Sequence, residues 1–534
     1  MKTWHDVASL YQIYPRSFRD TNGDGIGDLN GITEKLDYLA WLGVDAIWIS
    51  PFFTSPMTDF GYDIADYRAI DPTFGDLEDF QKLLEKAHSL DIKVMIDLVP
   101  CHTSDQHPWF QEARSSRDNP RRDYYVWRDR RDGKEPNNWR SLSGGSSWEL
   151  DEPTGQFYLH SFLKTQPDLN WDNPAVRDEM KNVVRFWFDM GVDGMRVDAI
   201  WGISKDPNLG DDSPNPDFHG DPEAYGAFIH DHCKIGPRFR EYLHELASVC
   251  DEYDDKQMVF EFYPDEKLGD IYQQYHKVLT AHPKASAFFM EYRQDEWHAE
   301  HTGQKIEKYL QAAGSAKSFF CLGNHDQPRI ASRLGTERAR ALHFLNLLTP
   351  GVSVIYYGDE IGMTNGELTA DDIQDTFSPA NSVIDSRDLE RTPMQWDETQ
   401  FAGFSDVKPW LPVNKNHTFI NVAEEKKNRY SILNIHRQLL QLRQDLPLLR
   451  DGSLSVIHDT DNGFILGIKR ELDGEQAYIF INFADAPQSF SIPENAEIIA
   501  STHPRYLILR SGRQLAVPGY CGVLMVSDTT INSA

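Results

Sequence analysis

The sequence is poor in cysteine and has no long apolar run. Five cysteines are scattered over 534 residues, with no C-x-x-C pair among them. Such a sparse, odd set argues against a disulfide framework and indicates reduced thiols. No apolar stretch is long enough to span a bilayer, and the first residues, MKTWHDVASLYQIYPRSF, are too polar for a signal peptide. We therefore expect a cytoplasmic protein with no membrane partner.

Positive charge is also scarce. Lys and Arg number 53 against 83 Asp and Glu, which leaves a formal net charge of −30. Nucleic acids and anionic membrane surfaces are themselves negative, so this balance argues against both as partners and favours a neutral substrate. Hydrophobic residues make up 40% of the chain, enough for a sizeable core, and the length predicts two or three domains.

Eight short apolar runs alternate with segments of helical period such as 30–42, 77–90 and 174–190. This alternation predicts an α/β protein, a (β/α)8 TIM barrel rather than an open sheet. Polar residues collect at the C-terminal ends of the runs, where such barrels carry their chemistry. The predicted strands are Tyr11–Phe18, Ala46–Pro51, Val94–His102, Gly194–Ile200, Met258–Tyr263, Ser286–Tyr292, Ser318–Asp326 and Val354–Glu360.

Two irregular stretches interrupt this pattern. Residues 102–172, after the third strand, predict an inserted subdomain, and residues 362–412, after the eighth, predict a functional lid or wall. A long helix is expected over 428–443, followed by short alternating strands that predict a C-terminal antiparallel β-sandwich. The expected division is a first barrel part at 1–101, the subdomain at 102–172, a second barrel part at 173–451 and the C-terminal domain at 452–534.

The most informative stretch is Gly194–Gly202, GMRVDAIWG. Side chains alternate along a strand, so Arg196 and Asp198 point to the same side. Opposite charges that face a packed interior are costly unless they serve each other or a ligand. From this stretch alone, a structural ion pair and a functional site are about equally expected.

Two further carboxylates, Glu261 and Asp326, belong to the fifth and seventh predicted strands and would meet Asp198 at one barrel mouth. Crowded carboxylates have pKa values that split, so one stays charged while another holds a proton. A charged nucleophile and a proton donor are what acetal hydrolysis needs. His102 and His325 lie at the same end and could hold sugar hydroxyls.

Ten segments then occur in an order and at spacings that point to a known family. They are YQIYPRSFRDTNGDGIGDLNGI, GVDAIWISPFF, DFGYDIADY, DLVPCHTSDQHPWF, QPDLNW, GMRVDAI, EFYP, GNHDQPR, YYGDEIGM and RTPMQW. The chain closely resembles the α-amylase superfamily of glycoside hydrolases (family 13), in its oligo-1,6-glucosidase and α-glucosidase branch. The resemblance covers nearly the whole chain. It implies a retaining α-glucosidase that uses no organic cofactor.

The resemblance also implies a role for each matching residue. Asp198 matches the nucleophile, Glu261 the general acid/base, and Asp326 the third carboxylate, which grips sugar hydroxyls. The resemblance assigns substrate contacts to Arg196, which orients the nucleophile, to His102 and His325, to the aromatic platform Tyr62, and to Asp59 and Arg391, an ion pair that closes the pocket. A closed pocket implies an exo mode that releases one glucose at a time. Asp97 is expected to be a buried structural partner.

The segment DTNGDGIGD is a separate signal. It offers oxygen ligands at Asp20, Asn22, Asp24 and Asp28, with the backbone carbonyl near Ile26, and this set suits a hard cation. The spacing is similar to an EF-hand loop, in which Gly25 would allow the sharp turn, but no helix precedes it. A polar turn that binds nothing is the alternative. The family resemblance favours a structural Ca²⁺, with Mg²⁺ as the second choice.

Three positions depart from, or refine, the family pattern. Cys101 stands where many relatives have Asn, so we expect no second calcium there and a buried, inert thiol. Phe260 replaces a small residue and is expected to reshape the pocket wall. Ala199, after the nucleophile, leaves more room than the valine that accompanies α-1,6 preference. It favours α-1,4 linkages and maltose-type oligosaccharides, with transglucosylation to a sugar or alcohol.

Other functions stay open at this point. An oligo-1,6-glucosidase is one, and a glucosyltransferase or isomerase of the sucrose isomerase or trehalose synthase type is another. A non-catalytic sugar-binding relative is a remote third, because such relatives lose catalytic carboxylates and carry a membrane helix. The sequence does not distinguish a monomer from a dimer.

Overall fold

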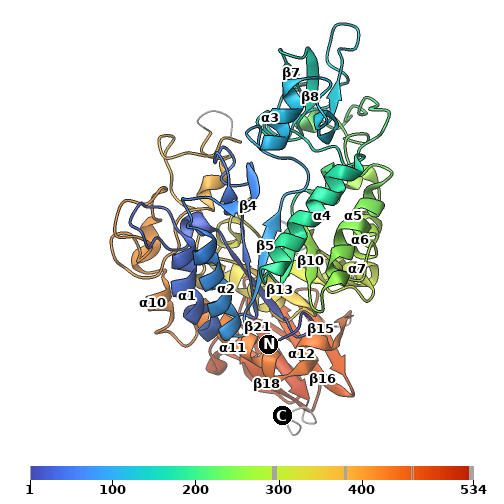
Figure 1. Ribbon diagram of the computed structural model, residues 1–534. Coiled ribbons are helices and arrows are strands. Elements are labelled where there is room, and N and C mark those ends of the chain that lie inside the picture. Colours follow the sequence, from blue (N-terminus) through green and yellow to red (C-terminus); the bar gives the residue numbers. More distant parts are fainter. Residues whose placement is uncertain (1, 292–296, 378–381, 459, 461, 528–534) are drawn as a thin grey trace.

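The computed structural model describes residues 2–291, 297–377, 382–458, 460 and 462–527. Its centre is a closed barrel of parallel strands in the order β1-β13-β12-β11-β10-β9-β5-β2 (Figure 1). The predicted (β/α)8 barrel is confirmed. The strands are β1 (Ser9–Ile13), β2 (Ala46–Ile49), β5 (Lys93–Leu98), β9 (Gly194–Val197), β10 (Gln257–Phe260), β11 (Ala285–Phe289), β12 (Phe319–Cys321) and β13 (Val352–Tyr356).

Each barrel strand overlaps a predicted one but ends earlier. β9 ends at Val197 rather than at Ile200, and β12 ends at Cys321 rather than at Asp326. The polar residues after these ends lie in turns at the barrel mouth and are not part of the hydrogen-bonded strands. Tyr292, the predicted end of the sixth strand, lies outside the described residues.

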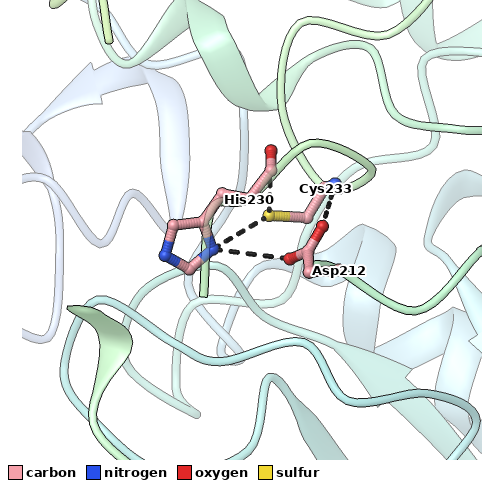
Figure 2. Close-up of side chains that lie close together, drawn as sticks. All are labelled: Asp212, His230 and Cys233. Carbon is pink, nitrogen blue, oxygen red and sulfur yellow. Dashed lines mark hydrogen bonds and ion pairs between the residues drawn. The ribbon is translucent and has the colours of Figure 1, made fainter. Parts of the chain in front are cut away.

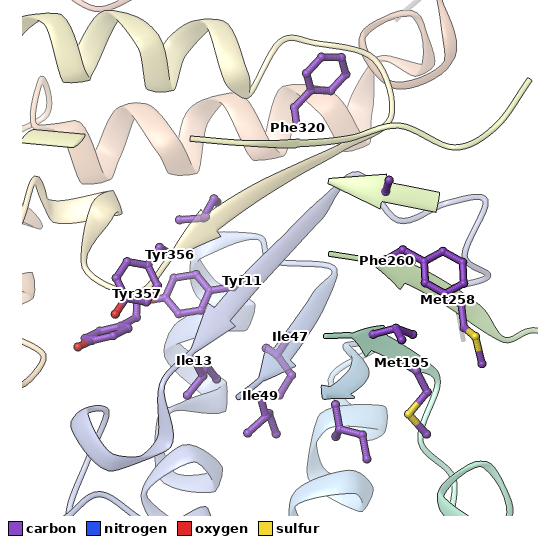
Figure 3. Packing of buried hydrophobic residues seen from close by; sticks show 14 of the residues in the cluster. Tyr11, Ile13, Ile47, Ile49, Met195, Met258, Phe260, Phe320, Tyr356 and Tyr357 are labelled. Carbon is purple, nitrogen blue, oxygen red and sulfur yellow. The ribbon is translucent and has the colours of Figure 1, made fainter. Parts of the chain in front are cut away.

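Alternate residues of the barrel strands face opposite sides. Met258 and Phe260 of β10 pack in the outer layer between barrel and helices (Figure 3), whereas Val259 belongs to the cluster inside the barrel. The prediction that Phe260 reshapes the pocket wall is therefore wrong, because its ring points away from the mouth and is fully buried.

Several of the helices around the barrel begin at polar capping residues. The side chains of Asp28, Asp76 and Asn173 accept backbone N–H groups in the first turns of α1, α2 and α4. Ser431 caps α11 in the same way, so that helix begins four residues after its predicted start. The helices are α1 (Leu29–Leu42), α2 (Leu77–Ser89), α4 (Pro174–Asp189), α5 (Phe239–Ala247), α6 (Ile271–Leu279), α7 (Ala299–Ala313), α8 (Ile330–Leu334), α9 (Thr336–Asn346), α10 (Val422–Glu425), α11 (Ile432–Asp445) and α12 (Pro447–Asp451).

Irregular segments build one end of the molecule. The stretch after β5 carries α3 (Pro108–Ser115) and a small antiparallel sheet of β6 (Trp127–Arg128), β8 (Gln156–Leu159) and β7 (Trp148–Asp151). A hairpin of β3 (Phe53–Thr54) and β4 (Asp66–Ile70) lies between β2 and α2. A further irregular segment, which the sequence patterns do not predict as an insertion, runs from 203 to 238 between β9 and α5 and is called the 203–238 loop below. Residues 378–381 of the predicted lid lie outside the described residues.

The C-terminal part forms two antiparallel sheets that enclose their own apolar cluster. This end lies opposite α3, β7 and β8 (Figure 1). The sheets are ordered β14-β15-β16-β21-β18 and β17-β20-β19 and consist of β14 (Ser453–Ile457), β15 (Ile465–Leu472), β16 (Glu475–Asn482), β17 (Gln488–Ser491), β18 (Ala496–Ser501), β19 (Leu509–Ser511), β20 (Gln514–Val517) and β21 (Gly522–Ser527). The predicted antiparallel fold of this part is confirmed. Residues 528–534 are outside the described part, and the domain boundaries stay predictions.

Two of the sequence's absences can be compared with the structure. None of the five cysteines, all of which are described, forms a disulfide. Among the helices of the described residues, none has the length and apolarity that a bilayer crossing requires.

Candidate active site

One pocket, about 380 Å³ in volume, lies at the carboxyl ends of the barrel strands. Its size is that of a small-molecule site, about 300–1,000 Å³. Asp198, Glu261 and Asp326 all line it. Asp198 directly follows β9 and Glu261 directly follows β10, and these strands are neighbours in the barrel. The structure thus brings together the three carboxylates whose convergence the predicted chemistry requires.

Arg196 on β9 serves three carboxylates at once. Its Nη1 donates to Asp97 Oδ1 and to Asp198 Oδ1, both at 2.6 Å. Its Nη2 lies 2.5 Å from Glu261 Oε1. The arginine has no exposed surface and lies over the Trp48 ring, 4.8 Å from its centroid. Arg196 and these three carboxylates are called the pocket floor below. A buried charge group of this kind persists only when its members satisfy one another.

The floor holds more negative than positive charge. Burial raises the pKa of Asp198 well above its ordinary value, with Arg196 opposing the rise. Burial likewise raises the pKa of Asp97 to about 6, again against Arg196. One guanidinium cannot neutralise three carboxylates, so the floor favours keeping a proton on one of them. Both shifts fall on Asp198 and Asp97, and the charge of Arg196 is what favours the ionised form of each.

The turn after β9 fixes the relation between two of the carboxylates. Ala199 adopts a left-handed backbone conformation, with φ 44° and ψ 43°. Its N–H donates to Glu261 Oε2 at 3.1 Å. Glu261 is thereby held from two sides, by Arg196 and by this backbone N–H. A small side chain suits the position, because bulky residues strain in this region.

Asp326 occupies a different electrostatic setting. Its Oδ1 accepts from Arg391 Nη2 at 2.8 Å and lies 3.4 Å from Arg387 Nη1, and its Oδ2 lies 3.3 Å from His325 Nε2. Burial raises its pKa, but the charges of Arg391 and Arg387 outweigh that effect and bring it well below its usual value. Asp326 therefore stays charged while the floor retains a proton.

Neutral polar and aromatic groups complete this side of the pocket. Burial lowers the pKa of His102 and of His325, so both rings are neutral near pH 7. Tyr62 stacks on His325, with centroids 5.2 Å apart and an angle of 6° between the planes. Neutral imidazoles and an aromatic face suit sugar hydroxyls and sugar rings. All three residues line the pocket, as their predicted roles require, and the roles themselves stay predictions.

The predicted pairing of Asp59 with Arg391 is wrong. Asp59 Oδ1 instead accepts from Arg387 Nη2 at 2.9 Å, and its Oδ2 accepts from Gln166 Nε2 at 2.9 Å. Arg391 is only 1% exposed and lies behind Asp326, where it also donates to the His325 carbonyl. The two arginines lie one helical turn apart in sequence, on either side of Asp388. Arg387, at the start of a short 3-10 helix, is the one that reaches the pocket.

The 203–238 loop, together with Trp201 just before it, forms a wall of the pocket that the sequence patterns do not indicate. Lys234 Nζ lies 5.0 Å from the Trp201 ring centroid and 4.9 Å from that of Tyr225, and all three residues line the pocket. They are called the loop wall below. Behind it, Cys101 is fully buried against Ala199 and Trp201, as expected for an inert thiol. The only sequence signal for this wall is a run rich in Asp, Pro and Gly without helical period.

The predicted cation loop forms a tight turn, and none of its residues lines the pocket. Asp20 accepts the N–H groups of Gly23 and Gly25, Asp24 accepts that of Ile26, and Asp28 caps α1. Gly25 has φ +87°, and a Cβ there would lie 2.4 Å from the Lys408 carbonyl, so glycine is required. The donor set consists of oxygen alone, which fits a hard cation. These hydrogen bonds hold the loop in shape but do not identify a metal.

Comparison with known proteins gives consistent results. The family model described as "Alpha amylase, catalytic domain" matches residues 12–452. The chain is 39% identical over 532 residues to the oligo-1,6-glucosidase of Parageobacillus thermoglucosidasius, covering 92% of this chain and 93% of that protein. It is 39% identical over 511 residues to a "Probable alpha-glucosidase" of Rhizobium meliloti (strain 1021), covering 92% and 91%.

Solved structures agree with this. The crystal structure of the alpha-glucosyl transfer enzyme XgtA superposes with a TM-score of 0.91 at 37% identity, covering 99% of this chain and 100% of that one. An isomaltulose synthase mutant from Erwinia rhapontici NX5, solved with its natural substrate sucrose, superposes with a TM-score of 0.87 at 35% identity, covering 98% and 99%. The resemblance stated from the motifs is confirmed.

Proposed function

The chain belongs to the alpha-amylase family of glycoside hydrolases, and from that premise we propose that it is an exo-acting α-glucosidase. It would release glucose from the non-reducing end of short α-glucosides and transfer glucosyl groups as a second activity. The observation that carries the proposal is the pocket floor, where Asp198 and Glu261 contact one guanidinium group and both line the pocket. Carboxylates held this closely support the retaining geometry, with a separation of about 5–5.5 Å.

In the proposed mechanism Asp198 attacks the anomeric carbon while Glu261 protonates the leaving oxygen. A covalent glucosyl ester then forms at Asp198. Glu261, now a carboxylate, removes a proton from the incoming water or sugar hydroxyl, which displaces Asp198 from the anomeric carbon. Arg196 orients the nucleophile and balances the changing charge on both carboxylates. Asp326 binds substrate hydroxyls.

The exo mode is supported by the ion pair between Asp59 and Arg387. Together with Tyr62 and His102 it bounds the side of the pocket that holds the terminal sugar in this proposal. Arg387 has a side chain only 19% exposed, and it also bonds Asp375 at 2.7 Å, which anchors it. A chain end fits such a pocket, whereas the middle of a polysaccharide does not.

The linkage proposal depends on Ala199. Its methyl group lies beside the nucleophile and leaves room next to the loop wall, which favours α-1,4 over α-1,6 bonds. Oligo-1,6-glucosidase activity is the nearest competing function, since the relative named above carries that name. Isomerisation of sucrose is the second, given the isomaltulose synthase structure. Transfer to a second sugar is supported by the likeness to an alpha-glucosyl transfer enzyme.

Product analysis tests this proposal. The enzyme is incubated with maltose, isomaltose, trehalose, sucrose and p-nitrophenyl α-glucoside, with Asp198→Asn as the inactive control. We expect glucose from maltose faster than from isomaltose, appearing first as the α-anomer in a proton NMR time course. Release of glucose from none of them would refute the hydrolase assignment. Isomaltose turned over faster than maltose would replace the linkage proposal, and isomaltulose formed from sucrose would support the isomerase.

We further propose that the cation loop holds a structural Ca²⁺, or Mg²⁺ in its place. Asp20, Asn22, Asp24 and Asp28 would hold the ion with the Ile26 carbonyl, far from the pocket. Adding Ca²⁺ to chelator-treated enzyme should raise the melting temperature by a few degrees, and Asp24→Asn should abolish the rise. An unchanged melting temperature in the native enzyme would leave the loop as a plain polar turn. A cytoplasmic location is proposed from the composition and the reduced cysteines.

A further inference from the structure

Three side chains of the 203–238 loop meet in the interior, and none of them lines the catalytic pocket. Asp212, His230 and Cys233 are 2%, 3% and 8% exposed. His230 Nδ1 lies 3.4 Å from Asp212 Oδ2 and 3.5 Å from Cys233 Sγ (Figure 2). The three ligand atoms lie within 4.8 Å of one another. They come together although Asp212 and Cys233 are 21 positions apart in the chain.

Hydrogen bonds alone leave this group unsatisfied. His230 Nε2 lies 2.9 Å from the Tyr225 carbonyl oxygen, which can only accept, so Nε2 carries the ring hydrogen and the Nδ1 of a neutral ring presents a lone pair. Asp212 Oδ2 is buried and lacks a partner in good hydrogen-bond geometry, with the Cys233 thiol as the donor beside it. The Cys233 thiol has a single hydrogen for these two acceptors. An unpaired buried acceptor is costly, so the group has room for one more positive centre.

Two of the three distances between ligand atoms, those at His230, fit a tetrahedral metal centre. With Zn–N of about 2.0–2.1 Å, Zn–O of about 2.0–2.2 Å and Zn–S of about 2.3 Å, tetrahedral angles require N···O and N···S edges of about 3.4 and 3.6 Å. The two edges at His230 are 3.4 and 3.5 Å. An N–H···O hydrogen bond, in contrast, would bring His230 and Asp212 to about 2.9 Å.

The supporting contacts also resemble those of a metal site. The other carboxylate oxygen of Asp212 accepts the backbone N–H groups of His232 at 2.8 Å and of Cys233 at 3.2 Å, which orients Oδ2 toward the group. The bond from His230 Nε2 to a carbonyl fixes the tautomer that leaves Nδ1 free to bind. Asp212 and His230 are thus each held in place by backbone groups behind them.

We propose that Asp212, His230 and Cys233 form a binding site for a zinc-class divalent cation. A mixed N, S and O set selects Zn²⁺ over Ca²⁺ and Mg²⁺, which prefer oxygen alone. On binding, the Cys233 thiol releases its proton to solvent and the thiolate bonds the metal. A water molecule completes four-coordination.

The site would stabilise the loop wall of the pocket. His230 stacks on the Tyr225 ring, with centroids 3.8 Å apart, and Cys233 directly precedes Lys234. A metal that fixes His230 and Cys233 therefore fixes the two wall residues next to them. The metal takes no part in bond cleavage, and the proposal does not depend on which glucoside is the substrate.

Metal binding can be tested directly on the full-length enzyme. Chelator-treated protein is dialysed against Zn²⁺ or Co²⁺, and the bound metal is measured by mass spectrometry. We expect about one equivalent per chain, and for cobalt a near-ultraviolet sulfur-to-metal absorption band. The cation loop contains no sulfur and cannot produce this band. Less than about 0.2 equivalents, or cobalt bound without the band, would overturn the proposal.

A matched pair of variants assigns the ligands. His230→Asn removes the ring ligand, and asparagine tolerates the positive φ of 63° at this position. His232→Asn makes the same change two residues away, at a ring that bonds Asp206 and is 38% exposed. We expect the first to lose the cobalt band and the second to keep it. Equal bands in the two variants would overturn the assignment. Cys233→Ser, which preserves a hydroxyl donor to the same acceptors, should also lose the band.

A measurement on unaltered enzyme covers the case in which these variants fold poorly. The rate at which iodoacetamide modifies Cys233 is followed by peptide mass spectrometry with and without Zn²⁺. Zinc should slow the reaction at least several-fold and raise the melting temperature. Equal rates and an equal melting temperature would mean that the three side chains form a hydrogen-bonded group only, and the proposal would fail.

Discussion

The pocket floor and the loop wall face the same cavity but are built in opposite ways. The floor consists of charged side chains on or directly after adjacent barrel strands, all joined through Arg196. The wall consists of two aromatic rings and Lys234 on irregular chain, held by ring contacts. Parallel strands fix positions over a whole family, whereas loops can be exchanged. The floor is therefore suited to the common chemistry, and the wall to the choice of leaving group and acceptor.

The largest expected effect comes from the floor. Asp198→Asn removes the proposed nucleophile but keeps the side chain's size, and kcat should fall on the order of 10⁴-fold for every substrate alike. Steady-state rates with maltose and with p-nitrophenyl α-glucoside would test this. A loss confined to one of the two would mean that the floor also selects the leaving group, which would break the comparison.

The second-largest effect is expected at Arg387. This residue lies on a loop, as the wall residues do, but it forms ion pairs with carboxylates, as Arg196 of the floor does. Arg387→Gln leaves Asp59 without its cation and should lower kcat/KM on the order of 100-fold. Asp59→Asn should do the same, and the double variant should lose little more, because both residues act as one pair. If instead Asp59 couples to Arg391 in such a cycle, the pairing seen here is wrong.

A tenfold effect is expected where floor and wall meet. Ala199→Val adds two methyl groups beside the leaving group, which should shift the ratio of maltose to isomaltose turnover about tenfold toward isomaltose. Part of the cost is backbone strain, because valine tolerates φ 44° poorly. Ala199→Gly accepts that backbone, adds no bulk, and should retain the maltose preference. An unchanged ratio in the valine variant would mean that Ala199 does not determine the linkage preference.

The smallest effect on turnover is expected at Glu390, on the loop that carries both arginines. Burial raises its pKa to about 8 from 4.5. Between these pH values the folded enzyme keeps a proton that the unfolded chain has lost. Stability therefore falls as pH rises, by up to about 1.4 kcal/mol per pH unit. Glu390→Gln should flatten this slope in urea titrations from pH 5 to 8 and leave kcat within about twofold. The exposed Glu367→Gln should change neither quantity, and an identical slope in both variants would contradict the assignment.

The parts that could be predicted from the sequence are those with regular patterns. Apolar runs separated by helical period give the barrel, and a charged residue in or directly after such a run, as at Asp198 and Glu261, places a side chain at its mouth. Ion-pair partners in loops could not be predicted in the same way. Arg387 and Arg391 lie one turn apart in the same segment, and only the three-dimensional path of that loop decides which one reaches Asp59.

The loop wall could not be predicted from the sequence for a related reason. Nothing in the run that contains Asp212 and His230 repeats with the period of a helix or strand, so no neighbour relation follows from the order of residues. The prediction for Phe260 is wrong for a different reason. The apolar run identifies its strand, but the motif comparison that suggests a wall role disregards the alternation of side chains along β10.

The shared guanidinium of the floor has a consequence for inhibition. Three carboxylates share one cation, so the floor carries a net negative charge whenever two of them are ionised. A neutral sugar does not compensate this charge. A six-membered ring of glucose shape that carries a protonated nitrogen would bring the missing countercharge with it. Such an amine should bind the pocket far more tightly than glucose does, because it balances the charge and not because its shape differs.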